Sequence, residues 1–435
     1  TCALPILGSA QRMKEVAKLI TDGEQKIVVL SAMSGTTNTL VEISDYLYKK
    51  NPEGANEIIN KLEAKYKQHI DELFATQEYK QKGLEVVKSH FDYIRSYTKD
   101  LFTLFEEKVV LAQGELISTA MVNFYLQECG VKSVLLPALE FMRTDKNAEP
   151  DPVYIKDKLR AQLDLYPDTE IYITQGFICR NAYGEIDNLQ RGGSDYTASL
   201  IGAAVNASEI QIWTDIDGMH NNDPRIVDKT APVRQLHFEE AAELAYFGAK
   251  ILHPTCIQPA KYANIPVRLL NTMDPEAPGT LISNDTEKGK IKAVAAKDNI
   301  TAIKIKSSRM LLAHGFLRKV FEIFESYQTS IDMICTSEVG VSVTIDNTKH
   351  LNEILDDLKK YGTVTVDKEM CIICVVGDLE WENVGFEAKA LDAMRDIPVR
   401  MISFGGSNYN ISFLIRECDK KVALQSLSDM LFNGK

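Results

Sequence analysis

The stretch Lys26-Ile-Val-Val-Leu-Ser31, followed by the loop Ala32-Met-Ser-Gly-Thr-Thr-Asn38, decides the fold class. A run of β-branched and apolar residues is typical of a strand buried on both faces, and the small, hydroxyl-rich loop ends it. Helical stretches separate three further short strands, which are Ser133–Leu136, Glu170–Thr174 and Glu209–Thr214. Strands that alternate with helices predict an α/β fold, in which helices cover both faces of a parallel sheet.

Ligands of such sheets bind beyond the carboxyl ends of the strands. Three polar segments occupy that position, namely Ser31–Asn38, Thr174-Gln-Gly-Phe177 and Thr214-Asp-Ile-Asp-Gly218. We therefore expect them at one edge of the sheet. Between about residues 39 and 127 the apolar spacing is helical and the remaining positions are highly charged, which predicts a helical block beside the sheet.

Composition excludes several classes of protein. The 435 residues suffice for two or three domains, and 45% hydrophobic with 25% charged residues is typical of a soluble globular protein. A net charge of −12 without a Lys/Arg stripe argues against a nucleic-acid partner. No apolar run approaches the roughly 20 residues of a membrane span, so we expect neither a membrane partner nor a signal peptide. The eight scattered cysteines indicate reduced thiols and a cytoplasmic location, and the isolated Cys371 and Cys374 pair predicts no metal site.

The pattern of apolar and polar residues changes near residue 295, where a repeat begins. Gly315-Phe316 opens a helical segment through Tyr327, and strands over Ile331–Ile334 and Val341–Ile345 follow it. The same order recurs 70 residues later, with Gly385-Phe386, a helix through Met394, and strands over Val399–Ile402 and Asn410–Ile415. This predicts two copies of a small strand–helix–strand–strand–helix–strand unit, suited to sensing or assembly; chance similarity of α/β segments is the alternative.

The segment Leu189-Gln-Arg-Gly-Gly-Ser-Asp-Tyr-Thr-Ala198 carries the strongest chemical signal. Its glycine pair lets a backbone approach a bulky anion, with Arg191 before it to grip an oxyanion and Asp195 after it to face a cation. The apolar residues that follow predict a buried helix, whose N-terminus favours phosphate. An ordinary turn is the alternative.

Two other side chains suit a charged substrate. In Gln113-Gly-Glu115, which we expect to open a helix, Glu115 could face a substrate ammonium or remain a solvated residue favourable to the helix dipole. Thr37 could donate its hydroxyl to a carboxylate or phosphate, or could be a turn residue.

Nucleotide chemistry is indicated further along the chain. Asp215 or Asp217 could hold Mg²⁺ or a nucleotide, the alternative being an Asx turn, and Arg225 could bind phosphate. Lys250 follows a helix predicted over Phe238–Phe247 with Gly248 as its cap, and could neutralise a polyphosphate or serve the helix dipole. These groups occur without a nucleophile–base pair, which favours phosphoryl transfer.

At this point the motifs resemble those of the aspartokinases over residues 8 to about 430. In order they are Ser-Ala-Met-Ser-Gly-Thr-Thr-Asn, Gln-Gly-Glu, Thr-Gln-Gly-Phe, Gly-Gly-Ser-Asp-Tyr-Thr, Trp-Thr-Asp, Asp-Pro-Arg, Phe-Gly-Ala-Lys-Ile-Leu-His-Pro and Thr-Ser-Glu-Val. The resemblance implies an amino-acid-kinase αβα sandwich and two ferredoxin-like ACT domains. It also implies the reaction of L-aspartate and ATP to 4-phospho-L-aspartate and ADP, the first step toward lysine, threonine and methionine.

The resemblance implies domain bounds of 1–295 for the catalytic domain, 308–369 for an inserted first ACT domain, and 296–307 with 370–435 for the second. A strand near Thr301–Lys306 would thus pair with the segment from about residue 370 onward. The ACT domains imply a homodimer, and possible tetramers stay open.

The family's site residues carry over by position. Those for aspartate are Thr37, Glu115, Arg191, Gly193, Ser194 and Asp195, with Arg191 and Asp195 as catalytic residues. Those for ATP are Ser31, Gly35, Gly192, Gly193, Thr214, Asp215, His220, Arg225 and Lys250. His220 stands where many relatives carry a nucleotide-stacking Tyr. The cofactors implied are ATP and Mg²⁺, with direct in-line attack and no phospho-enzyme.

The first repeat resembles the lysine-inhibited branch of the family. Its implied effector residues are Met310, Gly315, Phe316, Ser330, Ile331, Asp332, Ser337 and Glu338. Asp332 and Glu338 suit a cationic effector, and the helix start at Gly315 suits its carboxylate. Lysine is the first choice of effector and threonine the second; ordinary surface carboxylates are the alternative.

The start of the chain departs from the family pattern. The family has a strand that ends in Lys-Phe-Gly-Gly-Thr-Ser-Val, whose Lys and glycines cradle the transferring phosphate. Here Thr1-Cys-Ala-Leu-Pro-Ile-Leu7 supplies neither, Pro5 is expected to disrupt a central strand, and no methionine precedes Thr1. We expect turnover reduced by roughly 10³-fold or more. The rival functions are a catalytically silent amino-acid sensor and a kinase for another amino acid such as glutamate, which Phe-Gly-Ala-Lys and the repeats argue against.

Overall fold

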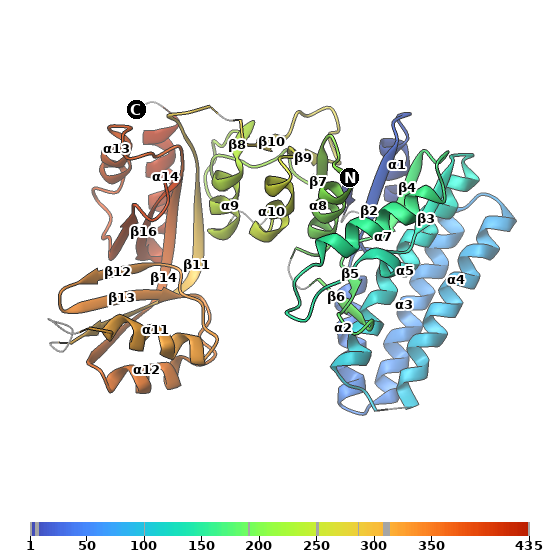
Figure 1. The fold of residues 1–435 in the computed structure, drawn as a ribbon, viewed down its shortest axis with the longest axis horizontal. Helices are drawn as coiled ribbons and strands as arrows, with labels where there is room; N and C mark the ends of the chain where they lie inside the picture. The colour runs from blue at the N-terminus through green and yellow to red at the C-terminus, as the bar shows by residue number, and fades with distance from the viewer. Residues whose placement is uncertain are drawn as a thin grey trace. The chain divides into compact units, whose positions relative to one another are not determined.

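A computed structural model describes residues 8–99, 101–189, 192–248, 252–285, 287–307 and 314–433, together with the backbone of residues 2–4. The chain divides into two compact units, which Figure 1 shows with their elements labelled. The first unit comprises Thr1–Met219 and Ile251–Asn284, and the second comprises His220–Lys250 and Asp285–Lys435. Each unit is described by itself below.

The first unit is built on a sheet with the strand order β3-β4-β2-β1-β7-β9-β10. Its strands are β1 (Cys2–Leu4), β2 (Lys26–Leu30), β3 (Ser133–Leu136), β4 (Ile171–Gln175), β7 (Ile210–Thr214), β9 (Val267–Asn271) and β10 (Thr280–Ser283). Neighbouring strands pair in parallel, except that β10 is antiparallel to β9. A small hairpin, β5 (Ile178–Arg180) and β6 (Ile186–Asn188), follows β4.

Helices cover both faces of this sheet. They are α1 (Ala10–Ile20), α2 (Thr36–Tyr48), α3 (Pro52–Leu73), α4 (Gln77–Ser96), α5 (Leu104–Glu128), α6 (Ala138–Phe141), α7 (Pro152–Asp164), α8 (Gly193–Val205) and α10 (Pro254–Tyr262). Val28 and Leu30 point into a core shared with α1–α5, whereas the alternate residue Val29 faces away from it. The helix α8 contacts β1, β2 and β7 and packs on α7 and α10. The predicted α/β class, with a parallel sheet between helical layers, is confirmed.

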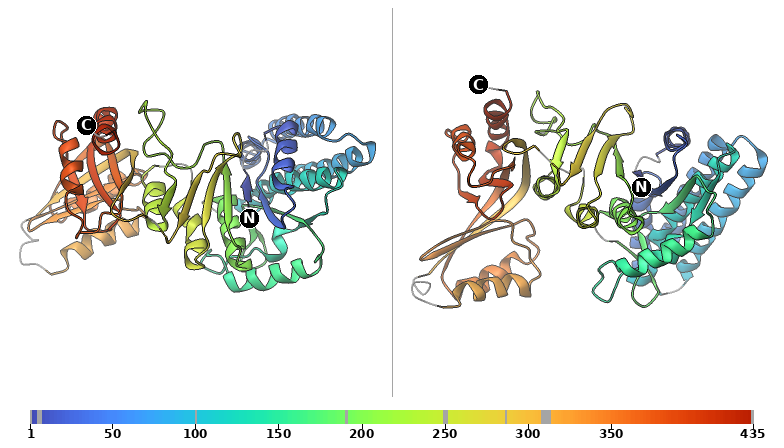
Figure 2. Two further views of the ribbon diagram at one scale, coloured as in Figure 1. Left: turned by 90° about the horizontal axis from the view of Figure 1, so that it is seen from above. Right: turned by 45° about the horizontal axis from the view of Figure 1, so that its top comes forward.

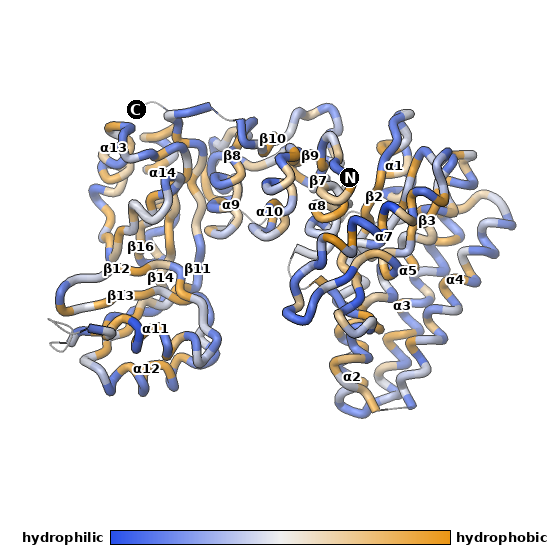
Figure 3. Tube along the Cα trace, viewed as in Figure 1, coloured by the Kyte–Doolittle hydropathy of each residue, from blue (hydrophilic) through white to orange (hydrophobic). Residues whose placement is uncertain are grey.

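The predicted helical block is formed by α2–α5, and Figure 2 shows α3, α4 and α5 running alongside one another. Amphipathic sequences explain these helices, since hydrophobic and hydrophilic residues alternate along α3 and α4 in Figure 3. By length and composition α5 alone among the described helices could cross a membrane, which the sequence analysis did not foresee. However, 78% of its apolar stretch is buried inside the unit, as expected of a core helix.

The strand β1 is short and central. Cys2–Leu4 pairs in parallel with β2 on one side and β7 on the other, and the disruption expected from Pro5 stays a prediction. Pairing of these three residues needs no N–H group from Pro5, because the strand ends at Leu4. Pro5 itself lies outside the described residues, as do Thr1 and residues 6–7.

The second unit contains a sheet with the order β12-β13-β11-β14-β16-β15. Its strands are β11 (Ile291–Lys306), β12 (Ile334–Ser337), β13 (Gly340–Ile345), β14 (Thr363–Gly377), β15 (Met401–Phe404) and β16 (Asn410–Arg416). Its main helices are α9 (Phe238–Tyr246), α11 (Phe316–Ser326), α12 (Leu351–Lys359), α13 (Phe386–Ala393) and α14 (Lys420–Leu431), and β8 (Gln235–His237) precedes α9. The predicted repeat is confirmed: Gly315 and Gly385 both cap a helix with positive φ, and each helix is followed by an antiparallel strand pair.

Two long antiparallel strands, β11 and β14, run through both repeats. Thr301–Lys306 was expected to pair with the chain from about residue 370 onward, and this is wrong. These residues pair with Gly340–Ile345 and with residues 363–367, whereas residues 291–297 pair with 372–377. The physical reason is the length of β11, whose earlier half already occupies the partner positions beyond Met370. The domain bounds implied by the resemblance stay a prediction.

Candidate active site

The carboxyl ends of β2, β4 and β7 lie on one edge of the first unit's sheet, since these strands are parallel. The loops after β2 and β4 are joined directly, because the Gly176 N–H donates to the Leu30 carbonyl at 2.8 Å. The expectation that these polar segments share one edge is therefore confirmed. The side chains and backbone groups that could bind a ligand lie in or next to these polar segments.

The loop after β2 leads into α2. Gly35 caps this helix with a φ of +81°, and Thr37 lies in the first helical turn, half-buried. The Ser118 hydroxyl of α5 donates to the Ser31 carbonyl at 2.8 Å, which fixes the start of the loop. Thr37 thus lies at a helix N-terminus, where exposed N–H groups favour an anion.

The position of Glu115 within α5 differs from the prediction. Gln113-Gly-Glu115 was expected to open a helix, but α5 begins at Leu104 and places Glu115 in its interior. The reason is a capping box in which the Thr103 and Glu106 side chains satisfy each other's backbone N–H groups. The alternative of a solvated first-turn carboxylate is also wrong, since Glu115 is 3% exposed.

The buried carboxylate of Glu115 faces the loop after β2. Its Oε1 accepts a hydrogen bond from the Ala32 N–H at 3.3 Å, while Oε2 has no hydrogen-bond partner among the described residues. Gly114 allows this approach, because a Cβ there would lie 2.9 Å from the Ala32 Cβ. Burial raises the pKa of Glu115 to about 7, although the Ala32 N–H opposes the shift.

The glycine pair caps α8, as predicted. Gly192 has a φ of +76°, and Gly193, Ser194 and Asp195 form the first turn. A side chain at Gly192 would meet the Cys256 Sγ at 2.0 Å, so both the conformation and the space require glycine. Burial raises the pKa of Asp195 to about 7. The predicted residue Arg191 lies outside the described residues.

The segment after β7 is held by its own polar groups. The Thr214 hydroxyl donates to the Ile216 carbonyl at 3.0 Å, and the Thr214 carbonyl accepts from the Thr272 N–H at 2.9 Å. Asp217 accepts from the Gly279 N–H at 3.1 Å, whereas Asp215 is exposed to solvent. Of the two carboxylates, Asp215 is therefore the better placed to meet a metal–nucleotide complex.

The remaining predicted nucleotide residues belong to the second unit. The His220 Nδ1 contacts the Thr230 hydroxyl at 3.0 Å. The Arg225 side chain is 74% exposed and forms an ion pair with Asp223 at 2.7 Å. Lys250 lies outside the described residues.

The predicted effector residues also belong to the second unit. Gly315 caps α11, and Phe316 is its first residue. Ser337 and Glu338 are exposed at the turn between β12 and β13, and Ser330 is exposed as well. Ile331 and the backbone of Asp332 lead into β12, but the Asp332 side chain is buried. Met310 lies outside the described residues.

Sequence reasoning missed the residues that hold the site together. The Gln175 side chain accepts from the Ala138 N–H at 2.8 Å and donates to the Thr119 hydroxyl at 2.9 Å, which itself donates to the Glu115 carbonyl at 2.8 Å. The Thr197 hydroxyl accepts from the Phe177 N–H at 3.1 Å and so joins α8 to the loop after β4. The signal was the polar Gln175 at the end of an otherwise buried strand.

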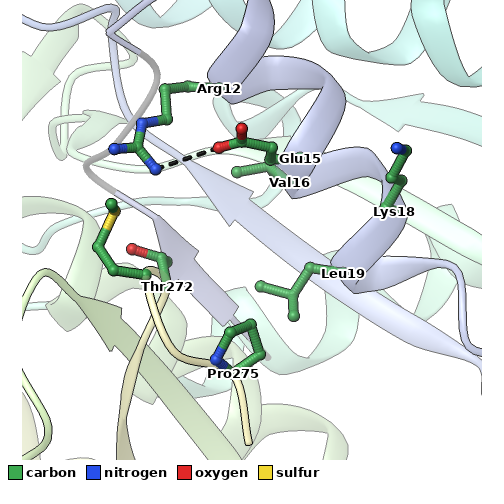
Figure 4. A pocket seen from close by; sticks show the side chains of 8 residues that line it. Arg12, Glu15, Val16, Lys18, Leu19, Thr272 and Pro275 are labelled. Carbon is green, nitrogen blue, oxygen red and sulfur yellow. Dashed lines mark hydrogen bonds and ion pairs between the residues drawn. The ribbon is translucent and has the colours of Figure 1, made fainter.

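A separate cavity of about 420 Å³ lies between α1 and the segment after β9. Figure 4 shows Arg12 hydrogen-bonded to Glu15 on α1, with Thr272 and Pro275 from the other side. None of the predicted site residues lines it; its walls are formed by Arg12, Glu15, Val16, Lys18, Leu19, Thr272, Met273 and Pro275.

Comparison with known families identifies the two kinds of domain in the chain. Residues 6–271 match the amino acid kinase family, and residues 373–431 match an ACT domain. The chain is similar to aspartokinase 1, chloroplastic, of Arabidopsis thaliana, with 35% identity over 100% of this chain and 80% of that protein. It is also similar to lysine-sensitive aspartokinase 3 of Escherichia coli (strain K12), with 32% identity over 95% of this chain and 94% of that protein.

Solved structures give a matching fold. Aspartokinase III of E. coli in complex with aspartate and ADP (R-state) aligns with a TM-score of 0.85 and 30% identity over 99% of both chains. The same enzyme in complex with lysine and aspartate (T-state) aligns with a TM-score of 0.81 and 31% identity, over 99% of this chain and 98% of that one.

Proposed function

This chain belongs to the amino acid kinase family and, within it, to the aspartokinases, and from that premise we propose how its residues bind and activate the substrates. As an aspartate kinase it transfers the γ-phosphoryl group of ATP to the β-carboxylate of L-aspartate, which gives 4-phospho-L-aspartate and ADP. The roles of individual residues below are our proposals.

The observation that carries the assignment of substrate is Glu115. Burying an ionised carboxylate with one unpartnered oxygen costs free energy unless a cation pairs with that oxygen. The α-ammonium of aspartate has the right charge and three donors. Asp195 on the first turn of α8 offers a second acid near the same edge. Both acids ionise fully when the ammonium binds, because an opposite charge lowers a carboxyl pKa.

The carboxylates of aspartate require donors. Arg191 and the Thr37 hydroxyl supply them in our proposal, together with the backbone of Gly193 and Ser194 at the N-terminus of α8. Arg191 also fixes the direction from which the β-carboxylate approaches phosphorus, and Asp195 holds the substrate in line for attack.

The residues that the resemblance assigns to ATP bind the nucleotide. Backbone at Ser31, Gly35, Gly192 and Gly193 lies along the phosphates, and Thr214 with Asp215 lies at the nucleoside side. By the resemblance alone, we also assign to the nucleotide the imidazole of His220 and the cations of Arg225 and Lys250. Mg²⁺ accompanies ATP as its phosphate-bound ion, with the exposed Asp215 as the protein carboxylate available to it; within the described ranges no three acidic, imidazole or thiol groups gather into a metal cage.

The chemistry needs no protein nucleophile. The attacking group is the β-carboxylate of aspartate, which is ionised at neutral pH, so the residues position it and stabilise charge on the transferring phosphoryl group. Cationic side chains offset the charge that moves onto the leaving ADP oxygen, and Mg²⁺, when bound, would supply further positive charge there. Loss of one such cation weakens the transfer without preventing binding.

ADP release with L-aspartate, ATP and Mg²⁺ tests this function. The chain is compared with a version in which residues 1–7 are replaced by Lys-Phe-Gly-Gly-Thr-Ser-Val. We expect at least a roughly 10³-fold higher turnover number in the replaced version, since it regains a phosphate-binding Lys. Equal turnover would show that another cation performs this task. Silence in both would favour the second candidate, a catalytically silent amino-acid sensor.

We also propose feedback control by lysine, with threonine as the second choice, through the exposed turn at Ser337 and Glu338 and the α11 start at Gly315. The kinase domain (1–295) and the two ACT domains (308–369, and 296–307 with 370–435) form homodimers through the ACT domains, and tetramers are a further possibility. Seven unpaired cysteines in the described part of the chain support a reducing compartment, for which we propose the cytoplasm.

A further inference from the structure

A partly buried ionic cluster in the second unit joins the first repeat to the end of α9. The Lys297 Nζ of β11 contacts the Asp332 Oδ1 at 2.7 Å and the Asp346 Oδ2 at 2.9 Å. The same Nζ lies 4.4 Å from the centre of the Tyr246 ring. The Tyr246 hydroxyl donates to the Asp332 Oδ1 at 2.8 Å, so the lysine and the tyrosine share one carboxylate oxygen.

This arrangement gives Asp332 an internal cation. The Asp332 side chain is only 1% exposed, and its Oδ2 has no hydrogen-bond partner among the described residues. An effector ammonium that used Asp332 would therefore either displace Lys297 and Tyr246 from Oδ1 or bind the unpartnered Oδ2 and share the carboxylate. The Tyr246 hydroxyl loses its acceptor in the first case, and its bond is weakened in the second because the ammonium draws charge from the same carboxylate.

Tyr246 is the last residue of α9, directly before the Phe-Gly-Ala-Lys segment that ends at Lys250. Phe247 is buried and packs edge-on against the Tyr246 ring, at 5.0 Å between ring centres. Gly248, with a φ of +120°, lies so close to β11 that a Cβ would be 2.1 Å from the Ala296 carbonyl oxygen. The end of α9 is thus seated on Ala296 and Lys297, two consecutive residues of one strand.

The strand β11 is irregular at this point. Its pairing with β14 shifts register between Lys297 and Ile300, and Asn299 has a φ of +59°. Within this irregular stretch, Asp298 forms an ion pair with Lys420 of α14, at 2.7 Å. Neighbouring residues of β11 therefore contact different repeats, which makes this bulge a place where a change in one repeat alters the strand.

We propose that Lys297 and Tyr246 are positioning residues that couple occupation of the effector site at Asp332 to the end of α9 at residues 246–248. The proposal rests on the function proposed above, in which lysine is the effector and Lys250 binds ATP. Without effector, Tyr246 is bonded to Asp332 and holds the end of α9 on β11. When an effector ammonium binds Asp332, the bond to the hydroxyl is weakened or lost, and the end of α9 at residues 246–248 is released from β11. A ligand changes a conformation only by its different affinity for the two states, and here that difference is one charge-assisted hydrogen bond.

Tyr246→Phe tests the coupling, because it removes the hydroxyl and keeps the ring over Lys297. Lysine no longer has to break this bond, so its dissociation constant should fall by about 3- to 10-fold, the range of one hydrogen bond. At the same time the greatest inhibition of ADP release by saturating lysine should shrink. Tighter binding with weaker inhibition is a pattern that simple damage to the site does not produce. Tyr262→Phe, an exposed tyrosine of α10, is the matched control and should change neither quantity.

Binding is measured by calorimetry and the response of α9 by hydrogen exchange of residues 238–248, so both readouts hold even if turnover is low. In the unaltered chain lysine should change exchange there and around residues 315–338; in Tyr246→Phe only the second change should remain. Unaltered affinity and an unaltered α9 response in Tyr246→Phe would overturn the coupling while leaving the kinase assignment intact. Asp332→Asn should abolish lysine binding. If this variant still binds lysine normally, or the unaltered chain binds none, the effector assignment fails and the coupling with it.

Discussion

The buried carboxylate of Glu115 predicts that the first unit loses stability as the pH rises. Its pKa is raised from 4.5 to about 7 by burial, so the folded chain binds a proton that the unfolded chain has lost between these two values. The free energy of unfolding therefore falls through this window and is lowest above pH 7. The shift corresponds to roughly 3 kcal/mol at 1.36 kcal/mol per pKa unit.

Glu115→Gln removes the titration and keeps the shape, and its amide oxygen can still accept from the Ala32 N–H. Relative to the unaltered chain, the variant should gain about 1 kcal/mol of unfolding free energy at pH 5 and about 3 kcal/mol at pH 8. The direction follows from the sign of the shift, because the variant lacks a group whose ionisation opposes folding. Glu42→Gln, which changes an exposed carboxylate on α2, serves as the matched control.

Urea unfolding followed by tryptophan fluorescence measures the effect. The chain has two tryptophans, of which Trp213 is buried in the core of the first unit and Trp381 is 77% exposed in the second. A Trp381→Phe background therefore reports on the unit that contains Glu115. A difference that is constant from pH 5 to pH 8, or that shrinks as pH rises, would refute the reasoning.

The same unfolding experiment can be repeated in the presence of L-aspartate. If its ammonium completes the Glu115 carboxylate, aspartate at about 100 times its dissociation constant should raise the unfolding free energy at pH 8 by roughly 2.7 kcal/mol. Glu115→Gln should lose most of this gain at the same concentration, because an amide cannot pair with the ammonium as a charge does. Equal stabilisation of both proteins would place the ammonium elsewhere.

Three further predictions concern the packing of the first unit. Gly192→Ala should lower the unfolding free energy by about 2 to 4 kcal/mol, because the new side chain is strained at positive φ and also overlaps with Cys256. The control is Gly23→Ala, which is also at positive φ but has open space around it. It should lower the unfolding free energy by only about 1 to 2 kcal/mol in the same urea titration. Gln175→Leu leaves the buried Ala138 N–H without its acceptor and should cost about 1 to 3 kcal/mol, whereas the Thr119 hydroxyl keeps its bond to the Glu115 carbonyl; an unchanged urea midpoint would contradict this. Thr103→Ala removes the cap of α5 and should lower the thermal midpoint by an amount equivalent to about 1 kcal/mol, whereas no change would show that the box is dispensable.

The strands and the loops at their carboxyl ends could be predicted because the signals are local. A short apolar run that ends in a small polar loop specifies both the strand and the place of the loop, and β2, β4 and β7 follow this pattern. The start of α5 could not be found in this way, because the helix is apolar around most of its circumference and shows no periodic break. The signal that could have placed it was the Thr103-to-Glu106 capping box.

The pairing of strands in a sheet is harder to predict from the sequence than the positions of the strands. Thr301–Lys306 has a clear strand pattern, but nothing in that pattern states which strand lies beside it, and β11 continues for 16 residues. The contact of Lys297 with Asp332 is equally invisible in the sequence, because 35 residues separate the two side chains. Asp332 alone suggested a free carboxylate for an effector, whereas the fold supplies it with a lysine of its own.

The two repeats differ where charge decides specificity. At the offset of 70 residues, Asp332 corresponds to Ile402 and Glu338 to Asn408, while Ser337 corresponds to Ser407. The second repeat thus keeps the helix cap at Gly385 and the serine but has an apolar side chain and an amide where the first has two acids. An ammonium that leaves water needs a carboxylate to offset the loss of hydration. A cationic effector therefore has its acceptors in the first repeat alone, which is also the repeat that the Lys297–Tyr246 contacts join to α9.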